Sequence, residues 1–126
     1  IEGIFNAVGY ACWVNKEADI DAVTAVSGSG PAYFFLVYEA MQKVGEELGL
    51  DAETSAQLTL NTALGAAKLA LHSDQEPEAL RKQVTSPGGT TQAAIESFQA
   101  QDIENVFRTA MSSALNRAQE MSDDFS

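Results

Sequence analysis

The sequence is poor in basic residues, cysteine and histidine. Seven Lys and Arg stand against 18 Asp and Glu, so the formal net charge is -11, and there is one cysteine, Cys12, and one histidine, His72. The acidic balance argues against nucleic acid and anionic membranes as partners. One cysteine excludes an intrachain disulfide and is compatible with a reducing compartment, and together with one histidine it is a poor zinc ligand set. Because no apolar run approaches about 20 residues and no signal peptide is visible, we expect a cytoplasmic protein without a metal.

The 126 residues are enough for one domain with a core. We find no internal repeat, linker or convincing pair of strands, so the whole range 1–126 is predicted to be a single domain. The chain begins at Ile1 and not at Met, and its first residues resemble the end of a helix already under way. We therefore expect a piece of a longer protein.

Apolar residues recur with the period of a helix over most of the chain. The Ser27–Pro31 stretch, Ser-Gly-Ser-Gly-Pro, is expected to break the chain between two helices. Gly49 is expected to end a helix, and Asp51 and Asp102 are placed to cap the helices that follow them. The fold class is therefore all-α, a bundle of six or seven helices, with residues 10–14 as an extended connector. The helices are predicted over 1–8, 17–26, 31–48, 52–72, 78–84, 91–99 and 103–121.

Two of these helices indicate self-association. The segment Phe34–Tyr38 is apolar on nearly every side, which is typical of a helix buried on more than one face. The segment Asn61–Ala70 is rich in small residues, which let neighbouring backbones approach closely. We expect these helices to pack across a subunit interface.

The stretch densest in glycine and small polar residues runs Thr85-Ser86-Pro87-Gly88-Gly89-Thr90-Thr91. Proline fixes its own φ, the glycines can take positive φ, and Thr90 or Thr91 can cap the following helix. Backbone N–H groups at such a helix start favour an anion, either carboxylate or phosphate. The alternative is a plain helix–helix turn. No Gly-Lys-Ser/Thr follows, so the stretch is not a P-loop.

Other reactive side chains have simpler explanations. Ser27 and Ser29 lack the spacing and the strand-turn-helix context of a nucleophile elbow. Cys12 is expected to be a small buried apolar residue, and His72 is placed to favour a helix C-terminus.

Two motifs resemble those of the Δ1-pyrroline-5-carboxylate reductases. One runs from Asp21 to Tyr33 and contains Ser-Gly-Ser-Gly-Pro, and the other is Ser86–Thr91, Ser-Pro-Gly-Gly-Thr-Thr. Leu64–Lys68 also fits at the family's spacing, and the resemblance covers about residues 1–120. It is to the C-terminal domain only, of the 6-phosphogluconate-dehydrogenase-like type, because no strand followed by the glycine-rich dinucleotide fingerprint occurs here.

The resemblance implies an enzyme that reduces 1-pyrroline-5-carboxylate to L-proline with NADPH or NADH, bound mainly by an absent N-terminal Rossmann domain. It implies that this domain forms an intertwined homodimer, and it leaves further assembly and the proton donor to the imine open. It assigns no catalytic residue to this chain. By motif position, the implied cofactor contact is Gln83, where the family usually has Asn, and the implied substrate-site residues are Glu17, Ser86, Gly88, Gly89, Thr90 and Thr91.

Two hypotheses follow. The chain is either the dimerisation and substrate-binding half of this reductase or a non-catalytic dimerisation module of a related dehydrogenase-like protein. A pure dimerisation module has no need of Gly-Gly-Thr-Thr at a helix start, so the loop favours the enzyme.

Overall fold

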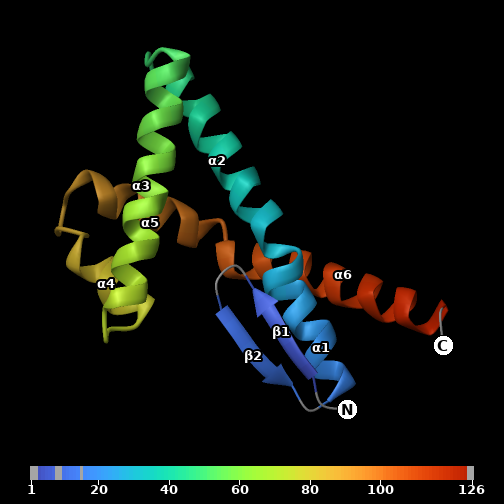
Figure 1. Ribbon diagram of the computed structural model, residues 1–126. Helices are drawn as coiled ribbons and strands as arrows, with labels where there is room; N and C mark the ends of the chain where they lie inside the picture. Colours follow the sequence, from blue (N-terminus) through green and yellow to red (C-terminus); the bar gives the residue numbers. More distant parts are fainter. Residues whose placement is uncertain (1–2, 8–9, 15, 125–126) are drawn as a thin grey trace. The chain divides into compact units, whose positions relative to one another are not determined.

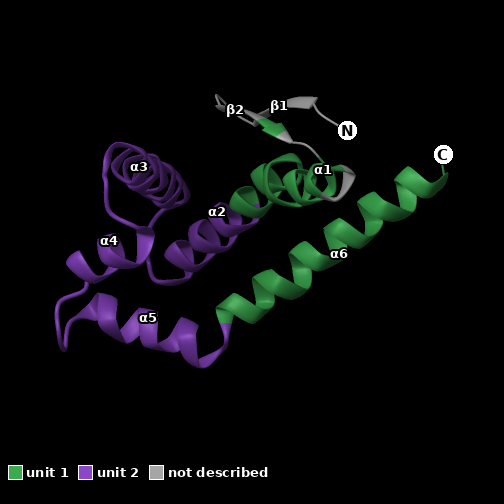
Figure 2. Cartoon of the chain, turned by 90° about the horizontal axis from the view of Figure 1, so that it is seen from below, with its two compact units in different colours: residues 1–35, 103–126 green, residues 36–102 purple. Residues whose placement is uncertain are grey.

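The computed structural model describes residues 3–7, 10–14 and 16–124, and of the side chains before Asp19 it describes only Trp13 and Lys16. The chain divides into two compact units, coloured separately in Figure 2. The first unit contains residues 1–35 and 103–126, and the second contains residues 36–102. We describe each unit by itself.

The first unit begins with a β-hairpin. Strand β1, Gly3–Ala7, pairs antiparallel with strand β2, Tyr10–Val14, so that Gly3 lies opposite Val14 (Figure 1). The predicted helix over 1–8 is therefore wrong for the described residues, and two strands form where none were expected. In so short a segment, apolar spacing fits a helix or a strand, and pairing with the β-prone run of β2 decides the outcome. Residue 8, where that helix was predicted to end, lies outside the described residues.

After the hairpin the chain remains helical through the segment that was expected to break it. Helix α1, Glu17–Val23, continues into a π-helical turn, η1, Thr24–Gly28. The Ser29 N–H donates to the Thr24 carbonyl over 2.9 Å, and the Tyr33 hydroxyl donates to the Ala25 carbonyl over 2.6 Å. Because these bonds satisfy the backbone groups of a widened turn, the glycines and serines cause a bend at Ser29 and not a loop.

Two long helices are joined by a short turn in the second unit, which contains the first of them from Leu36 onward. Helix α2 spans Gly30–Glu47 and helix α3 spans Ala52–His72, the bounds predicted for α3. Gly49 has a φ of 112°, and the predicted helix-ending role is confirmed by N–H bonds from the turn back to α2 carbonyls. The predicted cap is confirmed as well, since the Asp51 carboxylate accepts the Thr54 N–H over 2.8 Å.

Three further helices complete the described chain. The fold class is all-α as predicted, apart from the hairpin, and the α-helices of the described residues number six, together with the π-helical turn. The remaining bounds are α4, Pro77–Gln83; α5, Thr90–Ala100; and α6, Ile103–Asp124.

The chain buries very few apolar side chains. Among the described residues, Ala25 is the buried hydrophobic one, whereas Phe34 is 61% and Leu71 is 81% exposed. The helical run Asp19–Glu47 contains an 18-residue window with a mean hydropathy of 1.2. By length and composition alone, this run is long and apolar enough to cross a membrane, whereas the sequence analysis found no apolar run of about 20 residues. Large contiguous apolar exposure marks a surface that something else covers.

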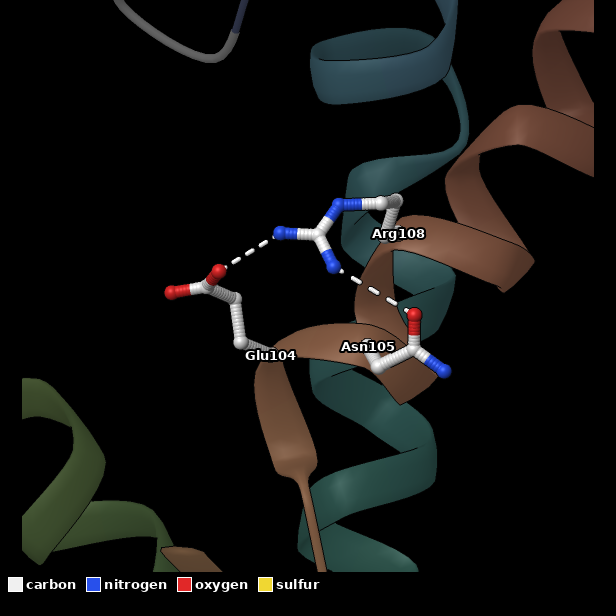
Figure 3. A network of polar contacts seen from close by, with 3 residues as sticks. All are labelled: Glu104, Asn105 and Arg108. Atoms are coloured by element: carbon white, nitrogen blue, oxygen red, sulfur yellow. Dashed lines mark hydrogen bonds and ion pairs between the residues drawn. The ribbon is translucent and has the colours of Figure 1, made fainter.

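The first unit also has a groove between α6 and the α1–η1 segment. It has a volume of about 420 Å³ and is lined mainly by apolar side chains. At its rim Arg108 binds Glu104 over 2.5 Å and Asn105 over 3.3 Å (Figure 3). These polar side chains are largely exposed, so the ion pair adds little stability. The lining residues are Ala22, Ala25, Val26, Glu104, Arg108, Met111, Ser112 and Leu115.

Candidate functional site

The glycine loop between α4 and α5 is a tight turn. The Gly89 N–H donates to the Ser86 carbonyl over 3.1 Å, which closes a four-residue turn. Pro87 occupies its second position, and Gly88, with a φ of 74°, occupies its third. This is the residue pattern of a type II turn, in which the third residue needs positive φ. A Cβ on Gly89 would lie 3.3 Å from the Ser86 carbonyl oxygen, a tight contact, so Gly88 is favoured by its positive φ and Gly89 by the space available.

The first backbone N–H groups of α5, which follows the turn, have no hydrogen-bond acceptor among the described residues. Gly89 holds the N-cap position and has no side chain to offer. The N–H groups of Thr90, Thr91 and Gln92 donate to no acceptor among the described residues. The first turn of α5 contains no acidic residue. These three donors lie at the positive end of an 11-residue helix, an arrangement that favours an anion.

The two threonines lie inside the helix and not at its cap. The expectation that Thr90 or Thr91 caps α5 is wrong, because the helix begins at Thr90 and the preceding turn leaves Gly89 as the cap. Both side chains are exposed, and neither hydroxyl bonds to another described residue. The hydroxyls are thus available to a ligand beside the open N–H groups.

Charge near the loop is mixed. Arg81 and Lys82 lie in the last turn of α4, shortly before the loop. Lys82 forms an ion pair with Glu78 over 3.1 Å, and this contact, with a smaller contribution from Arg81, lowers the pKa of the Glu78 carboxyl. Because the chain carries a net charge of -11, an anion here must be held by local dipoles and not by the overall field.

The other predicted site residues lie in different places. Gln83 ends α4, and its amide nitrogen donates to the Gln75 side-chain oxygen. Glu17 begins α1 in the first unit, whereas the loop belongs to the second, and its side chain lies outside the described residues. The structure therefore brings together Ser86, Gly88, Gly89, Thr90 and Thr91, and adds Gln83 only as the end of the preceding helix.

One residue of the loop was missed in the sequence. The Gln92 side-chain oxygen accepts the Gly88 N–H and ties the first turn of α5 to the glycine turn. Its place three residues after the cap is where a capping-box Glu or Gln reaches back toward the N-cap. That spacing, counted from Gly89, could have identified it.

The family comparison bears directly on this loop. Residues 17–121 match the family described as pyrroline-5-carboxylate reductase dimerisation. The chain belongs to this family. The match includes both motifs and every predicted site residue.

Relatives and solved structures agree with the family. The chain is 57% identical over 120 residues to a pyrroline-5-carboxylate reductase of Pseudomonas aeruginosa, covering 95% of this chain and 44% of that protein. It matches the structure of a Coxiella burnetii pyrroline-5-carboxylate reductase with a TM-score of 0.82 at 48% identity, over 85% of this chain and 40% of that one. It also matches a Plasmodium falciparum pyrroline carboxylate reductase with NADP bound, with a TM-score of 0.81 at 34% identity, over 85% and 41%. The chain thus spans less than half the length of these proteins.

Proposed function

We propose that this chain is the dimerisation and substrate-binding part of a pyrroline-5-carboxylate reductase, which reduces 1-pyrroline-5-carboxylate to L-proline with NADPH or NADH. Family membership over residues 17–121 supports the enzyme class. The observation that carries the substrate role is the open start of α5, where three backbone donors and two hydroxyls face no partner among the described residues. The substrate's carboxylate is the anion that we place there.

In this proposal the chain's contribution is orientation. The N–H groups of Thr90 and Thr91 and the Thr91 hydroxyl donate to the carboxylate, while Ser86, Gly88 and Gly89 shape the loop that presents them. Fixing the carboxylate holds the imine carbon at near-attack distance from the reductant. No side chain of this chain acts as a nucleophile. Glu17 is proposed near the substrate on the strength of its motif position.

Cofactor binding is assigned mainly to a part of the reductase outside this chain. The sheet of the described residues is an antiparallel hairpin, and it offers no strand–helix–strand unit for a dinucleotide pyrophosphate. The nicotinamide cofactor supplies the hydride when it is bound. Gln83 is proposed to contact this cofactor. To do so, its side-chain amide would give up the hydrogen bond that it donates to Gln75 and bond to the cofactor instead.

We further infer a homodimer, with the partner covering the exposed apolar faces of α2 and α3. The 61% exposure of Phe34 and the 81% exposure of Leu71 support an interface that one chain leaves open. We assign the apolar run Asp19–Glu47 to this interface in a cytoplasmic protein, with no membrane or nucleic-acid partner. Sedimentation at micromolar concentration should give twice 13.4 kDa and a concentration-dependent melt, whereas a monomer with a concentration-independent melt would overturn the interface.

The substrate role is tested by two substitutions in the full-length reductase. Thr91→Ala removes the proposed donor, and because a hydrogen bond to a charged group is worth roughly 1.5–3 kcal/mol, kcat/KM for the imine should fall about 10- to 150-fold. Thr91→Ser keeps the hydroxyl and should cost much less. Both variants should melt close to the parent enzyme, because Thr91 is not the cap of α5. A kinetically normal Ala enzyme would favour the dimerisation module instead.

A further inference from the structure

Gln92 closes the glycine loop from the side of the helix. It lies at the third position of α5, is half-buried, and accepts the Gly88 N–H through its side-chain oxygen. A backbone N–H can only donate, so the amide oxygen and not the nitrogen must face it. The neighbouring Gly89 N–H is already used by the Ser86 carbonyl. Gln92 thus supplies an acceptor to a loop donor that the turn itself leaves unpaired, and it leaves the donors of α5 open.

A glutamate at this position could make the same bond. Glu and Gln both serve in the capping box, and a carboxylate at a helix N-terminus gains from the dipole. On stability alone, the acid would be the better residue at position 92. Its charge, however, would lie within one helical turn of the open N–H groups of Thr90 and Thr91, where it would oppose a second anion.

We propose that Gln92 is a positioning residue of the substrate-carboxylate site, and that its neutrality is the property that matters. The inference rests on the proposed function, because it presumes that a substrate carboxylate binds at the start of α5. The amide holds Gly88 in the turn without supplying a negative charge, so the dipole and donors of α5 remain for the ligand. The site then binds the substrate carboxylate because the first turn of α5 contains no carboxylate of its own to repel the ligand.

The test separates charge from structure in the full-length reductase. Gln92→Glu keeps an acceptor for the Gly88 N–H and adds a charge, so it should raise KM for 1-pyrroline-5-carboxylate roughly 3- to 50-fold, which is the range for two like charges taken to be about 7 Å apart, from the dielectric of bulk water to that near a protein surface. The effect on kcat should be small. The increase should shrink as ionic strength rises, while the melting temperature is unchanged or higher. Gln99→Glu, the same change near the other end of α5, is the matched control and should leave KM unchanged.

Thr91→Ala is measured in the same series so that the two proposals fail separately. A raised, salt-sensitive KM in Gln92→Glu beside a raised KM in Thr91→Ala supports both. A normal KM in Gln92→Glu beside an impaired Thr91→Ala enzyme overturns the role of Gln92 and leaves the carboxylate site standing. Normal kinetics in both variants overturn the carboxylate site and, with it, the inference on Gln92. An increase in KM that Gln99→Glu shares also overturns it, since any added charge would then suffice.

Discussion

The α2–α3 connection and the α4–α5 connection both turn the chain from one helix into the next, but they treat the start of the second helix differently. Between α2 and α3, Gly49 takes a φ of 112°, and between α4 and α5, Gly88 takes one of 74°. The first connection is closed, because the Asp51 carboxylate accepts the Thr54 N–H at the start of α3. The second is open, because Gly89 replaces the acidic cap. A helix start that lacks its own anion is the one suited to an anion from outside.

The state of the capping carboxylate strengthens this contrast. Hydrogen bonds from the Thr54 backbone and hydroxyl hold the pKa of the Asp51 carboxyl below its ordinary value, so the cap is charged at neutral pH. Near this cap the two helices touch at Ser55, a residue that is 2% exposed and whose hydroxyl donates to the Gln42 carbonyl over 2.8 Å. These contacts stabilise the start of α3, which has a carboxylate of its own at the cap. At the start of α5 the cap residue, Gly89, has no side chain, so the first backbone N–H groups of this helix are not capped.

The largest effect is expected from making the open connection resemble the closed one. Gly89→Asp would place a carboxylate at the cap of α5, where it fills the N–H groups proposed for the substrate and repels the substrate's charge. In the full-length reductase, KM for the imine should rise about 100-fold or more, since the loss of a charged hydrogen bond and like-charge repulsion act together. Steady-state kinetics and thermal melts give the two readouts.

The control for this variant is Gly89→Ala. It brings the same Cβ to 3.3 Å from the Ser86 carbonyl oxygen but offers no cap and no charge. The difference in KM between the two variants therefore measures the carboxylate alone. Equal KM values in both enzymes would mean that no anion binds at this helix start.

A smaller effect, on stability and not on KM, is expected from the closed connection. A Cβ on Gly45 would lie 2.2 Å from the Ser55 hydroxyl oxygen, so Gly45→Ala must displace the hydroxyl or part the helices. Overpacking of this kind costs roughly 1–3 kcal/mol in free energy of unfolding. In a Ser55→Ala background the same substitution should cost less, because the clashing oxygen is gone. Denaturant unfolding of the parent, the two single variants and the double variant measures this coupling, and equal costs in both backgrounds would refute the close contact.

The sequence predicts well where local chemistry decides the structure. Helix α3 has its predicted bounds because Asp51 and Gly49 act through their own backbones and nearest neighbours. The glycine turn was recognised for the same reason, since positive φ at Gly88 is a local need. The type of each connection is therefore readable from a few adjacent residues.

The failures arise where a distant partner decides. Strand β1 depends on pairing with β2, which no periodicity within residues 3–7 reveals. The π-helical turn is held in part by the Tyr33 hydroxyl on the Ala25 carbonyl, eight residues away. Thr90 and Thr91 were expected to cap because hydroxyls favour that position, but the turn ends one residue earlier and gives the cap to Gly89.

The central claim is that the start of α5 holds the substrate's carboxylate. The most direct test is a crystal structure of the full-length reductase with L-proline, the product that carries the same carboxylate. We expect a carboxylate oxygen at roughly 2.7–3.2 Å from the backbone nitrogens of Thr90 and Thr91, with the Thr91 hydroxyl as a further donor and Gln92 still on Gly88. A proline carboxylate bound elsewhere, with these N–H groups facing water, would contradict the claim.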